Sequence, residues 1–399
     1  MKVSATLIVR NESKFIEDCL ESLVGVVDEI VLVDTGSSDD TLQKAQRYPI
    51  ALRSFPWCQD FSAARNYAIA QATGEWILYI DADERLEAAD RGVWREVVAN
   101  DRIAAWRLRF HPRVGWTPYG ELRLFRNDRR IRFRGVIHER IQPSVEEVCN
   151  SDGLEIGQCD ITLQHVGYET DQRHKLDRNI PLLRDYLRDD PERVYCWWHL
   201  GTMLGLSGDA EGAATAWRKG IEAVRSQAEG SKPLSHSMPF LSLIELEHSR
   251  GISVDDLLQE SLRLFPNQLY LQWLSCKLAL ERGEGETVRP HLEKLAAIDP
   301  ERLYDPGLSY NKTLFAHAAR ESLALCHFRA GRFREAAEWY RRAAPAAPDP
   351  QACEVRALLA DAKAVANCDN SRLGGRTGAA PVTFGSGAQE RENGGAPPD

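Results

Sequence analysis

The sequence predicts an α/β domain built on a mostly parallel sheet, followed by an all-helical repeat domain. Three observations carry this prediction. Strand and helix patterns alternate over residues 1 to about 110, apolar residues then recur with period two, and the second half of the chain repeats helical patterns between turn signals. Alternating strands and helices are typical of a parallel sheet covered by helices, and tandem helix pairs are typical of a solenoid.

The N-terminal residues show the strand–helix alternation directly. Apolar runs of strand length predict buried strands at residues 2–9, 29–34, 50–55 and 76–81. Apolar residues at helical spacing predict helices at residues 12–23 and 61–72, with a short helix ending near Arg47. Gly74 follows the helix at 61–72 and is a helix-stop signal. Parallel strands joined by helices bring the carboxyl ends of the strands to one edge of the sheet.

From residue 103 the apolar period changes to two. Apolar residues within 106–110, 122–124 and 131–137 alternate with polar ones. This period is typical of strands with one buried face. We therefore expect antiparallel strands here that complete a first domain at residues 1–168.

The helical half carries residues that mark tetratricopeptide repeats. Two copies have their aromatic and small positions at the spacing of that repeat: Trp197, Leu200, Gly201, Ala213 and Trp217, then Leu323, Gly331, Ala336, Tyr340, Ala343 and Pro348. Weaker copies centre on Gly251 and Gly283. Stacked helix pairs bury a continuous core, so we expect an α-solenoid over residues 169–368. Residues 369–399 are rich in Gly, Ala and Pro, and we expect them to be disordered.

Composition bounds the classes of partner. The chain has 399 residues and a formal net charge of −9, which argues against a nucleic-acid partner held by phosphate attraction. The arginines of residues 123–134 form a basic stretch, and we expect most of them to face solvent. No apolar run reaches the ~20 residues of a membrane span, and the start of the chain lacks a signal-peptide core. The 9 cysteines form no CxxC pair, so we expect reduced thiols in a cytoplasmic protein and no zinc site.

The strongest chemical signal is the acidic pair Asp81 and Asp83, which follows the expected strand at residues 76–81. In open α/β sheets, ligands bind beyond the carboxyl ends of the strands. Two carboxylates beside a diphosphate suit Mg²⁺ or Mn²⁺, which bridges protein to phosphate oxygens. In isolation, such a pair is also typical of a solvated acidic turn before a helix.

Two further motifs end at the same expected edge. Asp34 closes a buried strand, and its carboxylate can accept a hydrogen bond from a base N–H, while the polar residues after it can cap the next helix. Arg65 and Asn66 offer donors where a pyrophosphate would lie. The arginine can equally pair with one of the strand-end aspartates, and the sequence leaves both interpretations open.

In order and spacing, the motifs together resemble family 2 of the glycosyltransferases, which have the GT-A fold. The matching segments are residues 6–12, 33–41, 64–66 and 81–83. Residues 133–139 and 163–168 are similar to motifs of a bacterial subgroup with trailing tetratricopeptide repeats. Peptide S-glycosyltransferases that modify glycocin bacteriocins have a similar arrangement, and lipopolysaccharide-core glycosyltransferases share the N-terminal motifs.

The resemblance implies a role for each matching residue. Asp34 would contact the uracil, and the donor-binding set would be Thr6, Val9, Glu12, Asp34, Arg65, Asn66 and Asp81. Asp83 and His165 would hold Mg²⁺ or Mn²⁺. Family members mostly invert the anomeric carbon with a carboxylate as general base. No clear Glu-Asp motif precedes the repeats in the expected context, and Glu139 takes its place as the candidate.

The predicted function is metal-dependent, inverting transfer of a hexose from a nucleotide-diphosphate sugar, with UDP expected, to a peptide, protein or glycan acceptor. The repeats would bind the acceptor or form a homodimer. Two alternatives remain: a non-catalytic repeat scaffold with a glycosyltransferase-like domain, and a transferase acting on lipopolysaccharide or another cell-surface glycan. A nucleotidyltransferase is disfavoured, because residues 9–12 after the first strand contain no glycine.

Overall fold

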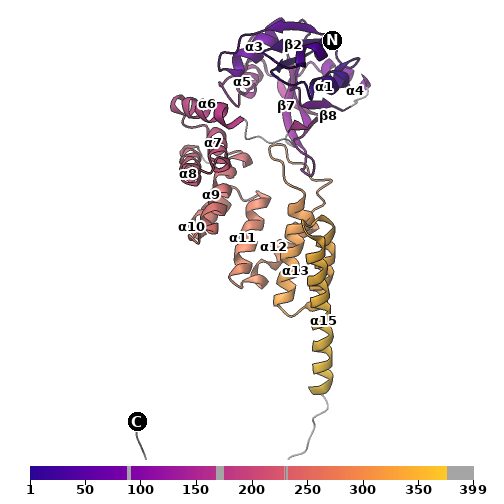
Figure 1. Cartoon of the computed structure of the whole chain (residues 1–399), viewed down its shortest axis with the longest axis vertical. Coiled ribbons are helices and arrows are strands. Elements are labelled where there is room, and N and C mark those ends of the chain that lie inside the picture. The colour runs from indigo at the N-terminus through magenta and orange to yellow at the C-terminus, as the bar shows by residue number, and fades with distance from the viewer. Residues whose placement is uncertain (88–90, 168–174, 229, 231, 375–399) are drawn as a thin grey trace, which may run out of the picture.

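The computed structural model describes residues 1–87, 91–167, 175–228, 230 and 232–374. An α/β domain forms the N-terminal part, and helical pairs extend away from it to the end of the described chain (Figure 1). The fold class predicted from the sequence is therefore confirmed: a mixed sheet with helices, followed by an all-helical region.

The N-terminal domain alternates strands and helices as expected. Its elements are β1 (Val3–Val9), α1 (Ile16–Leu23), β2 (Glu29–Asp34), α2 (Thr41–Ala45), β3 (Ala51–Ser54), α3 (Phe61–Gln71), β4 (Trp76–Tyr79), β5 (Glu84–Leu86), α4 (Arg91–Ala99), β6 (Ile103–His111), β7 (Tyr119–Arg126), α5 (Gln142–Asp152) and β8 (Glu155–His165). The first four strands lie where the apolar runs predicted them.

One sheet contains the strands in the order β3-β2-β1-β4-β7-β6-β8-β5. β1 pairs in parallel with β2 and β4, so these three strands end at the same edge of the sheet. β6 and β7 pair antiparallel, as their period-two pattern predicted. β8 instead runs parallel to β6, which makes the second half of the sheet mixed.

The strand expected at residues 131–137 is wrong, because that segment is irregular and leads into α5. The side chain of Asn66 hydrogen-bonds to both backbone groups of Phe133. Its Nδ2 donates to the carbonyl at 3.0 Å, and its Oδ1 accepts from the N–H at 2.9 Å. Ile131 and Phe133 are buried against α5. Asn66 therefore holds this segment, and the donor contact that the resemblance implies for it stays a prediction.

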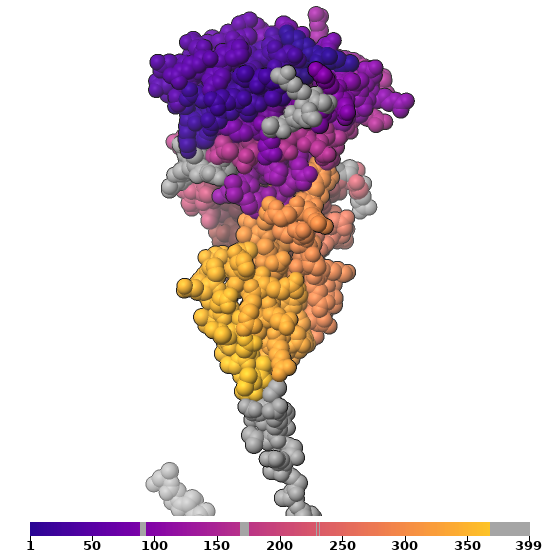
Figure 2. Space-filling view, turned by 90° about the vertical axis from the view of Figure 1, so that its right-hand side faces the viewer, coloured from indigo at the N-terminus to yellow at the C-terminus, as the bar shows by residue number. Residues whose placement is uncertain are grey.

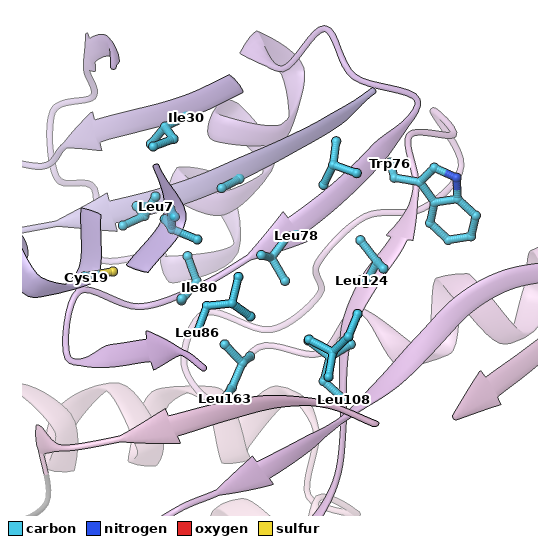
Figure 3. Close-up of a cluster of buried hydrophobic side chains, with 14 of the residues drawn as sticks. Leu7, Cys19, Ile30, Trp76, Leu78, Ile80, Leu86, Leu108, Leu124 and Leu163 are labelled. Carbon is cyan, nitrogen blue, oxygen red and sulfur yellow. The ribbon is translucent and has the colours of Figure 1, made fainter. Parts of the chain in front are cut away.

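A buried cluster fixes the strands relative to one another and to α1 (Figure 3). Its members include Leu7, Cys19, Ile30, Trp76, Leu78, Ile80, Leu86, Leu108, Leu124 and Leu163. Burying each large aliphatic side chain contributes about 1.5–3 kcal/mol. The indole N–H of Trp76 donates to the carbonyl of Val98 at 3.1 Å, which also ties α4 to the sheet. The loops at the sheet edge thus rest on a rigid base.

The helical domain consists of consecutive helix pairs. Its elements are α6 (Leu176–Asp189), α7 (Val194–Leu206), α8 (Ala210–Ser226), η3 (Leu234–Ser237), α9 (Met238–Ser249), α10 (Asp255–Leu264), α11 (Leu269–Glu281), α12 (Gly285–Ala297), η4 (Leu314–Ala318), α13 (Ala319–Arg329), α14 (Phe333–Ala343), η5 (Ala344–Ala346) and α15 (Pro350–Gly374). Residues 369–374 are helical, although the disordered tail was expected to begin there. The rest of the expected tail, 375–399, lies outside the described residues.

The expected repeat positions meet between α7 and α8. A Cβ atom on Gly201 would lie 2.3 Å from Nε1 of Trp217, so a glycine at this position lets the indole cross the helix. The same Nε1 donates to the carbonyl of Trp198 at 3.2 Å. The glycine and the tryptophan therefore act as a matched pair, which explains their spacing in the sequence.

Gly201→Ala is expected to destabilise the protein, because the added methyl group would overlap Trp217. Overpacking of this kind costs about 1–3 kcal/mol. Gly205 in the same helix is the matched control, since its added Cβ would only touch Ala213 at 3.8 Å. Gly205→Ala is expected to stabilise the helix by about 0.5–1 kcal/mol. Urea unfolding measures both changes, and shifts of the same sign would contradict this account.

The helical domain contacts the N-terminal domain a second time through the segment between α12 and η4. Thr117 N donates to the carbonyl of Tyr310 at 2.8 Å, and Tyr310 N donates to Oγ1 of Thr117 at 2.9 Å. Lys312 N donates to the carbonyl of Gly115 at 2.8 Å. Figure 2 shows the orange helical segment meeting the purple surface of the N-terminal domain. No sequence pattern predicted this contact, which joins residues separated by 193 positions in the chain.

Two further expectations concern thiols and membrane spans. Within the described ranges, no helix combines the length and apolar character needed to cross a bilayer. The cysteines whose side chains are described are free, and Cys19, Cys276 and Cys326 are among the buried ones. Burial raises the pKa of the Cys276 thiol to about 11, so this thiol is protonated at neutral pH.

Candidate functional site

Three loops meet at the carboxyl edge of the sheet, after β1, β2 and β4. The first two are tied together by hydrogen bonds. Oδ1 of Asn11 accepts from Ser38 N at 2.8 Å, and Glu12 N donates to Oγ1 of Thr41 at 2.7 Å. Asn11 has a φ of 58°, a left-handed conformation that asparagine tolerates better than most residues. The sequence motifs around these residues therefore build one continuous rim.

Asp34 ends β2 and shapes the loop that follows it. Its carboxylate is buried and accepts from Gly36 N at 3.2 Å and from Ser37 N at 3.0 Å. Gly36 has a φ of 111°, which favours glycine. Asp39, in turn, accepts from Thr41 N at 3.0 Å at the start of α2. Loop shaping and helix capping thus use different residues, and a carboxylate with about four acceptor positions leaves Asp34 room for a base N–H.

Asp81, at the end of the fourth strand, is held by two arginines. Nη2 of Arg65 donates to its Oδ1 at 2.8 Å, and Nη1 of Arg123 lies 3.9 Å from its Oδ2. Burial by itself would raise the pKa of Asp81, but the two guanidinium groups outweigh burial and lower it. Of the two interpretations of Arg65, the pairing with a strand-end aspartate is confirmed. Asp81 is consequently an ionised anchor of the site.

Arg123 and Glu84 form a buried ion pair beneath the Asp81–Asp83 turn. The guanidinium donates to both carboxylate oxygens, at 3.0 and 2.6 Å. Glu84 also accepts from Asp81 N at 2.9 Å. The side chains are 7% and 1% exposed, so the expectation of a solvated arginine is wrong for Arg123. The glutamate directly after the acidic motif was the available sequence signal, since a buried carboxylate needs a partner.

The structure brings together the two residues that the resemblance assigned to the metal. Nε2 of His165 lies 3.3 Å from Oδ2 of Asp83. β5 and β8 pair antiparallel with Glu84 opposite His165, and Val166 N donates to the carbonyl of Asp83 at 2.9 Å. A Cβ atom on Gly167 would lie 2.0 Å from the Asp83 carboxylate, so this approach requires a glycine. Tyr168, in the same motif, lies outside the described residues.

This pair fits two neighbouring positions around a divalent ion. Two ligands at about 2.1 Å from an octahedral ion lie ~3 Å apart, close to the observed separation. In the part of the chain that is described, no group of three His, Cys, Asp or Glu residues could hold a metal ion. A divalent ion on this pair would have positions open to phosphate oxygens and water, which is how Mg²⁺ commonly binds beside nucleotides.

Glu12 lies among these acids. Burial and then the charge of Asp83 raise its pKa from 4.5 to about 7, and Lys175 partly offsets them. Glu12 therefore carries a proton in part of the molecules at neutral pH. A carboxylate whose pKa is raised by neighbouring acids becomes easier to ionise when a cation binds nearby. The raised pKa of Glu12 therefore favours a cation-binding role for this site.

Glu12→Gln is expected to stabilise the free protein above pH 7. Because the pKa of Glu12 is higher in the folded state than its ordinary 4.5, the folded protein binds more protons than the unfolded chain, and stability falls as pH rises from 4.5 to about 7. The variant lacks this loss and should gain about 1 kcal/mol at pH 8, after allowance for solvent screening. Urea unfolding at pH 5 and 8 measures the gain, which should shrink at pH 5. Glu155→Gln, at an exposed position, should show no such pH dependence.

Two of the expected donor residues lie beneath the site. Thr6 and Val9 are buried in β1. The carbonyl of Val9 accepts from both Thr35 N at 2.9 Å and Thr35 Oγ1 at 3.1 Å, so its lone pairs are used within the protein. The carbonyl of Thr6 accepts from Ile80 N at 3.2 Å. The structure thus gives their backbones a scaffolding task beneath the site, and the nucleotide contact implied by the resemblance stays a prediction.

Glu139 lies where the sheet edge meets the helical domain. Its Oε1 accepts from Nε of Arg65 at 2.5 Å, which links it through this arginine to Asp81. The preceding His138 has a φ of 50° and stacks on His199 of α7 with ring centroids 4.1 Å apart. Burial lowers the pKa of His138 to about 4, so its ring is neutral. Glu139 therefore lies next to the acidic turn, where Arg65 joins it to Asp81. The stacking of His138 on His199 brings the first repeat to the same place.

Comparison with known proteins gives the family of the N-terminal domain. Residues 4–146 match the family model described as glycosyl transferase family 2. The chain is 35% identical over 240 residues to a TPR repeat-containing protein of Synechococcus elongatus, covering 57% of this chain and 58% of that protein. It is 30% identical over 229 residues to glycosyltransferase SunS of Bacillus phage SPbeta, covering 55% and 53%.

A third relative has a different described role. The lipopolysaccharide core biosynthesis glycosyltransferase LpsC of Rhizobium meliloti is 35% identical over 158 residues, covering 36% of this chain and 58% of that protein. The chain spans between 53% and 58% of the length of these curated relatives. Among solved structures, S. aureus TarS 1-349 in complex with UDP-GlcNAc has a TM-score of 0.38 and 17% identity, covering 66% of this chain and 91% of that one.

Proposed function

The N-terminal domain of this chain is a family 2 glycosyltransferase domain, and on that premise we propose that the protein transfers a hexose from a UDP-sugar to an acceptor held at the helical domain. One observation carries the proposal. Asp83 and His165 lie side by side at the carboxyl edge of the sheet, and the Asp81–Arg65–Glu139 chain leads from them toward the repeats. A donor site and an acceptor site would thus be neighbours.

The donor half rests on Asp34 and the Asp83–His165 pair. Asp34 would accept from the uracil imide, since its loop leaves acceptor capacity free. Asp83 and His165 would hold the divalent ion, and an imidazole ligand favours Mn²⁺ over Mg²⁺. Such an ion, when bound, offsets the negative charge that develops on the leaving diphosphate.

The acceptor half rests on Glu139. Arg65 fixes its Oε1, and within the described ranges its Oε2 makes no hydrogen bond. Oε2 would take the proton of the acceptor nucleophile as that nucleophile attacks the anomeric carbon from the face opposite the diphosphate, which inverts its configuration. Arg65 would keep the carboxylate oriented through the step.

We assign the acceptor to the face formed by the first helices of the successive pairs. Tyr195 and Trp198 on α7 have ring centroids 5.8 Å apart at 58°, and Tyr270 and Trp273 on α11 have centroids 5.3 Å apart at the same angle. The two aromatic pairs thus repeat one spacing and one geometry. Trp273 is half-buried.

Side-chain hydrogen bonds connect this face from helix to helix. They run from Trp198 to Ser242 at 3.1 Å, from Tyr270 to Glu245 at 2.7 Å and from Trp273 to Ser322 at 3.3 Å. A hollow of about 420 Å³ continues the face between α11, α13 and α15. Aromatic rings with polar tips suit an extended polypeptide, and we propose a peptide or protein as the acceptor.

The test is donor binding followed by transfer. Melting temperature is measured with UDP, Mn²⁺ and both together, and the expected result is a shift of several degrees only with UDP present, larger with Mn²⁺. Mass spectrometry of peptides incubated with UDP-sugars then reads out transfer. Absence of any UDP-dependent shift would favour the scaffold alternative, and transfer to lipopolysaccharide but to no peptide would favour the glycan alternative.

We also propose a homodimer through the repeats, built on the terminal helix. Val355, Leu358, Leu359 and Val365 of α15 are large apolar side chains that are 50–64% exposed. Terminal helices of a solenoid ordinarily present a polar outer face. Light scattering of the full chain distinguishes a dimer from a monomer.

A further inference from the structure

We propose that the first helix of the helical domain completes the donor site: Lys175 and Arg178, together with Arg10 of the first loop, bind the diphosphate of the donor. This inference rests on the proposed function and extends it, because it makes the repeat domain part of donor binding. The ligand class is a pyrophosphate ester. Arg10 precedes Glu12 in the loop after β1, and Arg178 packs on Phe61 at the start of α3.

Helix α6 is fixed against the edge of the sheet by apolar contacts. Residues from both domains belong to one cluster: Ile180, Leu183 and Tyr186 from α6, with Phe61, Val136 and Ile137 from the catalytic side. Gly135 permits close approach, since its Cβ would lie 3.2 Å from the hydroxyl of Tyr186. The packing holds the first turn of α6 beside the start of α3.

Arg178 is held in that first turn by the catalytic domain. Its guanidinium lies 5.3 Å from the ring centroid of Phe61, the first residue of α3. Its Nε donates to Oδ1 of Asn179 at 2.8 Å, which leaves both Nη groups available. The backbone N–H of Phe61 donates to the carbonyl of Val136 at 2.9 Å, so the ring beneath the cation is itself anchored. A guanidinium held in this way is preorganised for a bidentate anion.

In the part of the chain that is described, no carboxylate forms an ion pair with Arg10, Lys175 or Arg178, whereas Arg65 and Arg123 are both paired. Within the described residues, three cations that form no ion pair therefore lie in the loop after β1 (Arg10) and at the start of α6 (Lys175 and Arg178). An anion that binds there gains attraction from each of them without having to break an existing ion pair.

Electrostatics supports their proximity to the donor edge. Partial desolvation, and then the charge of Arg10, lower the pKa of Arg178, and Glu12 partly offsets this. The charge of Lys175 in turn lowers the pKa of Glu12, and the charge of Asp83 raises it. Glu12 therefore lies within electrostatic reach of both Lys175 and Asp83. A diphosphate at this rim would be attracted by the cations and by a metal ion held at Asp83 and His165.

The experiment compares Arg178→Ala and Arg178→Lys with Arg184→Ala, an exposed arginine on the same helix that serves as the matched control. Calorimetry measures binding of UDP, uridine and inorganic pyrophosphate to the full chain. Arg178→Ala should weaken UDP and pyrophosphate by about 10- to 100-fold, as expected for loss of charge-assisted hydrogen bonds. Arg178→Lys should retain part of this affinity, and uridine binding and Arg184→Ala should be unchanged.

The outcomes separate this inference from the proposed function. If wild-type protein binds UDP and Arg178→Ala binds it equally well, or if uridine weakens as much as UDP, the inference is overturned while the donor assignment stands. If wild-type protein binds pyrophosphate but neither UDP nor uridine, and Arg178→Ala loses the pyrophosphate, the anion site stands and the proposed donor is wrong. Circular dichroism of each variant checks that the fold is retained.

Discussion

Replacement of Asp83 by asparagine is expected to lower sugar transfer by about 100- to 1000-fold, the range typical of losing one preorganised group that stabilises developing charge. The amide keeps the size of the carboxylate but loses its charge, and so its ability to bind a divalent ion beside His165. The contact is close, with Nε2 of His165 at 3.3 Å from Oδ2 of Asp83, so a change of charge alone should suffice.

Titration of Mn²⁺ against transfer rate and against UDP binding measures this effect. The apparent affinity for Mn²⁺ should fall with the rate, whereas UDP binding without metal should change little. Asp40→Asn is the matched control, because Asp40 is exposed at the same rim and makes no capping hydrogen bond. Full metal-dependent activity in the Asp83 variant would show that the metal assignment is wrong.

Arg123→Met is expected to lower the free energy of unfolding by about 3–5 kcal/mol, because it leaves the carboxylate of Glu84 buried without a partner. Glu84 is 1% exposed, and two of its contacts come from this guanidinium. Its remaining contact, with Asp81 N at 2.9 Å, belongs to the acidic turn. Loss of the pair should therefore also loosen Asp81 and reduce donor binding.

Urea unfolding measures the loss, and two variants make its cause visible. Arg123→Met combined with Glu84→Gln should recover at least half of the stability, because the unpaired buried charge is gone. Arg218→Met removes an ion pair of the same 2.6 Å length at a half-exposed position and should cost less than about 1 kcal/mol. An Arg123 loss no larger than the Arg218 loss would contradict the role given to burial.

Arg65 links the acidic turn of both predictions to Glu139, the candidate general base. Arg65 joins Asp81 to Glu139, so the base candidate and the acidic turn share one guanidinium. A disturbance beneath the turn is therefore expected to reach Glu139 as well. Whether transfer and stability fall together in the Arg123 variant can be read from the same protein preparation.

The sequence alone determined the parallel half of the sheet and the position of its functional edge. The runs at β1, β2 and β4 are mostly apolar because both faces of these strands are buried, and that pattern is local. Asp34 is the last residue of β2 and Asp81 lies two residues beyond β4, so their shared edge could be predicted without coordinates. The Gly201–Trp217 pairing was readable for the same reason, since both residues lie in one helix pair.

Only the tertiary structure decided which charges are paired and which are free. Arg123 lies in a stretch that alternates like a solvated strand, yet Glu84 draws it inward through a contact across the sheet. Residues 131–137 alternate like a strand, but the side chain of Asn66 hydrogen-bonds to both backbone groups of Phe133. The second contact at Thr117 and the approach of Arg178 to Phe61 join segments far apart in the chain. Periodicity indicates which face of a segment is buried. It does not indicate which residues distant in the sequence pack against that face. The pairing of these charges could therefore be seen only in the folded chain.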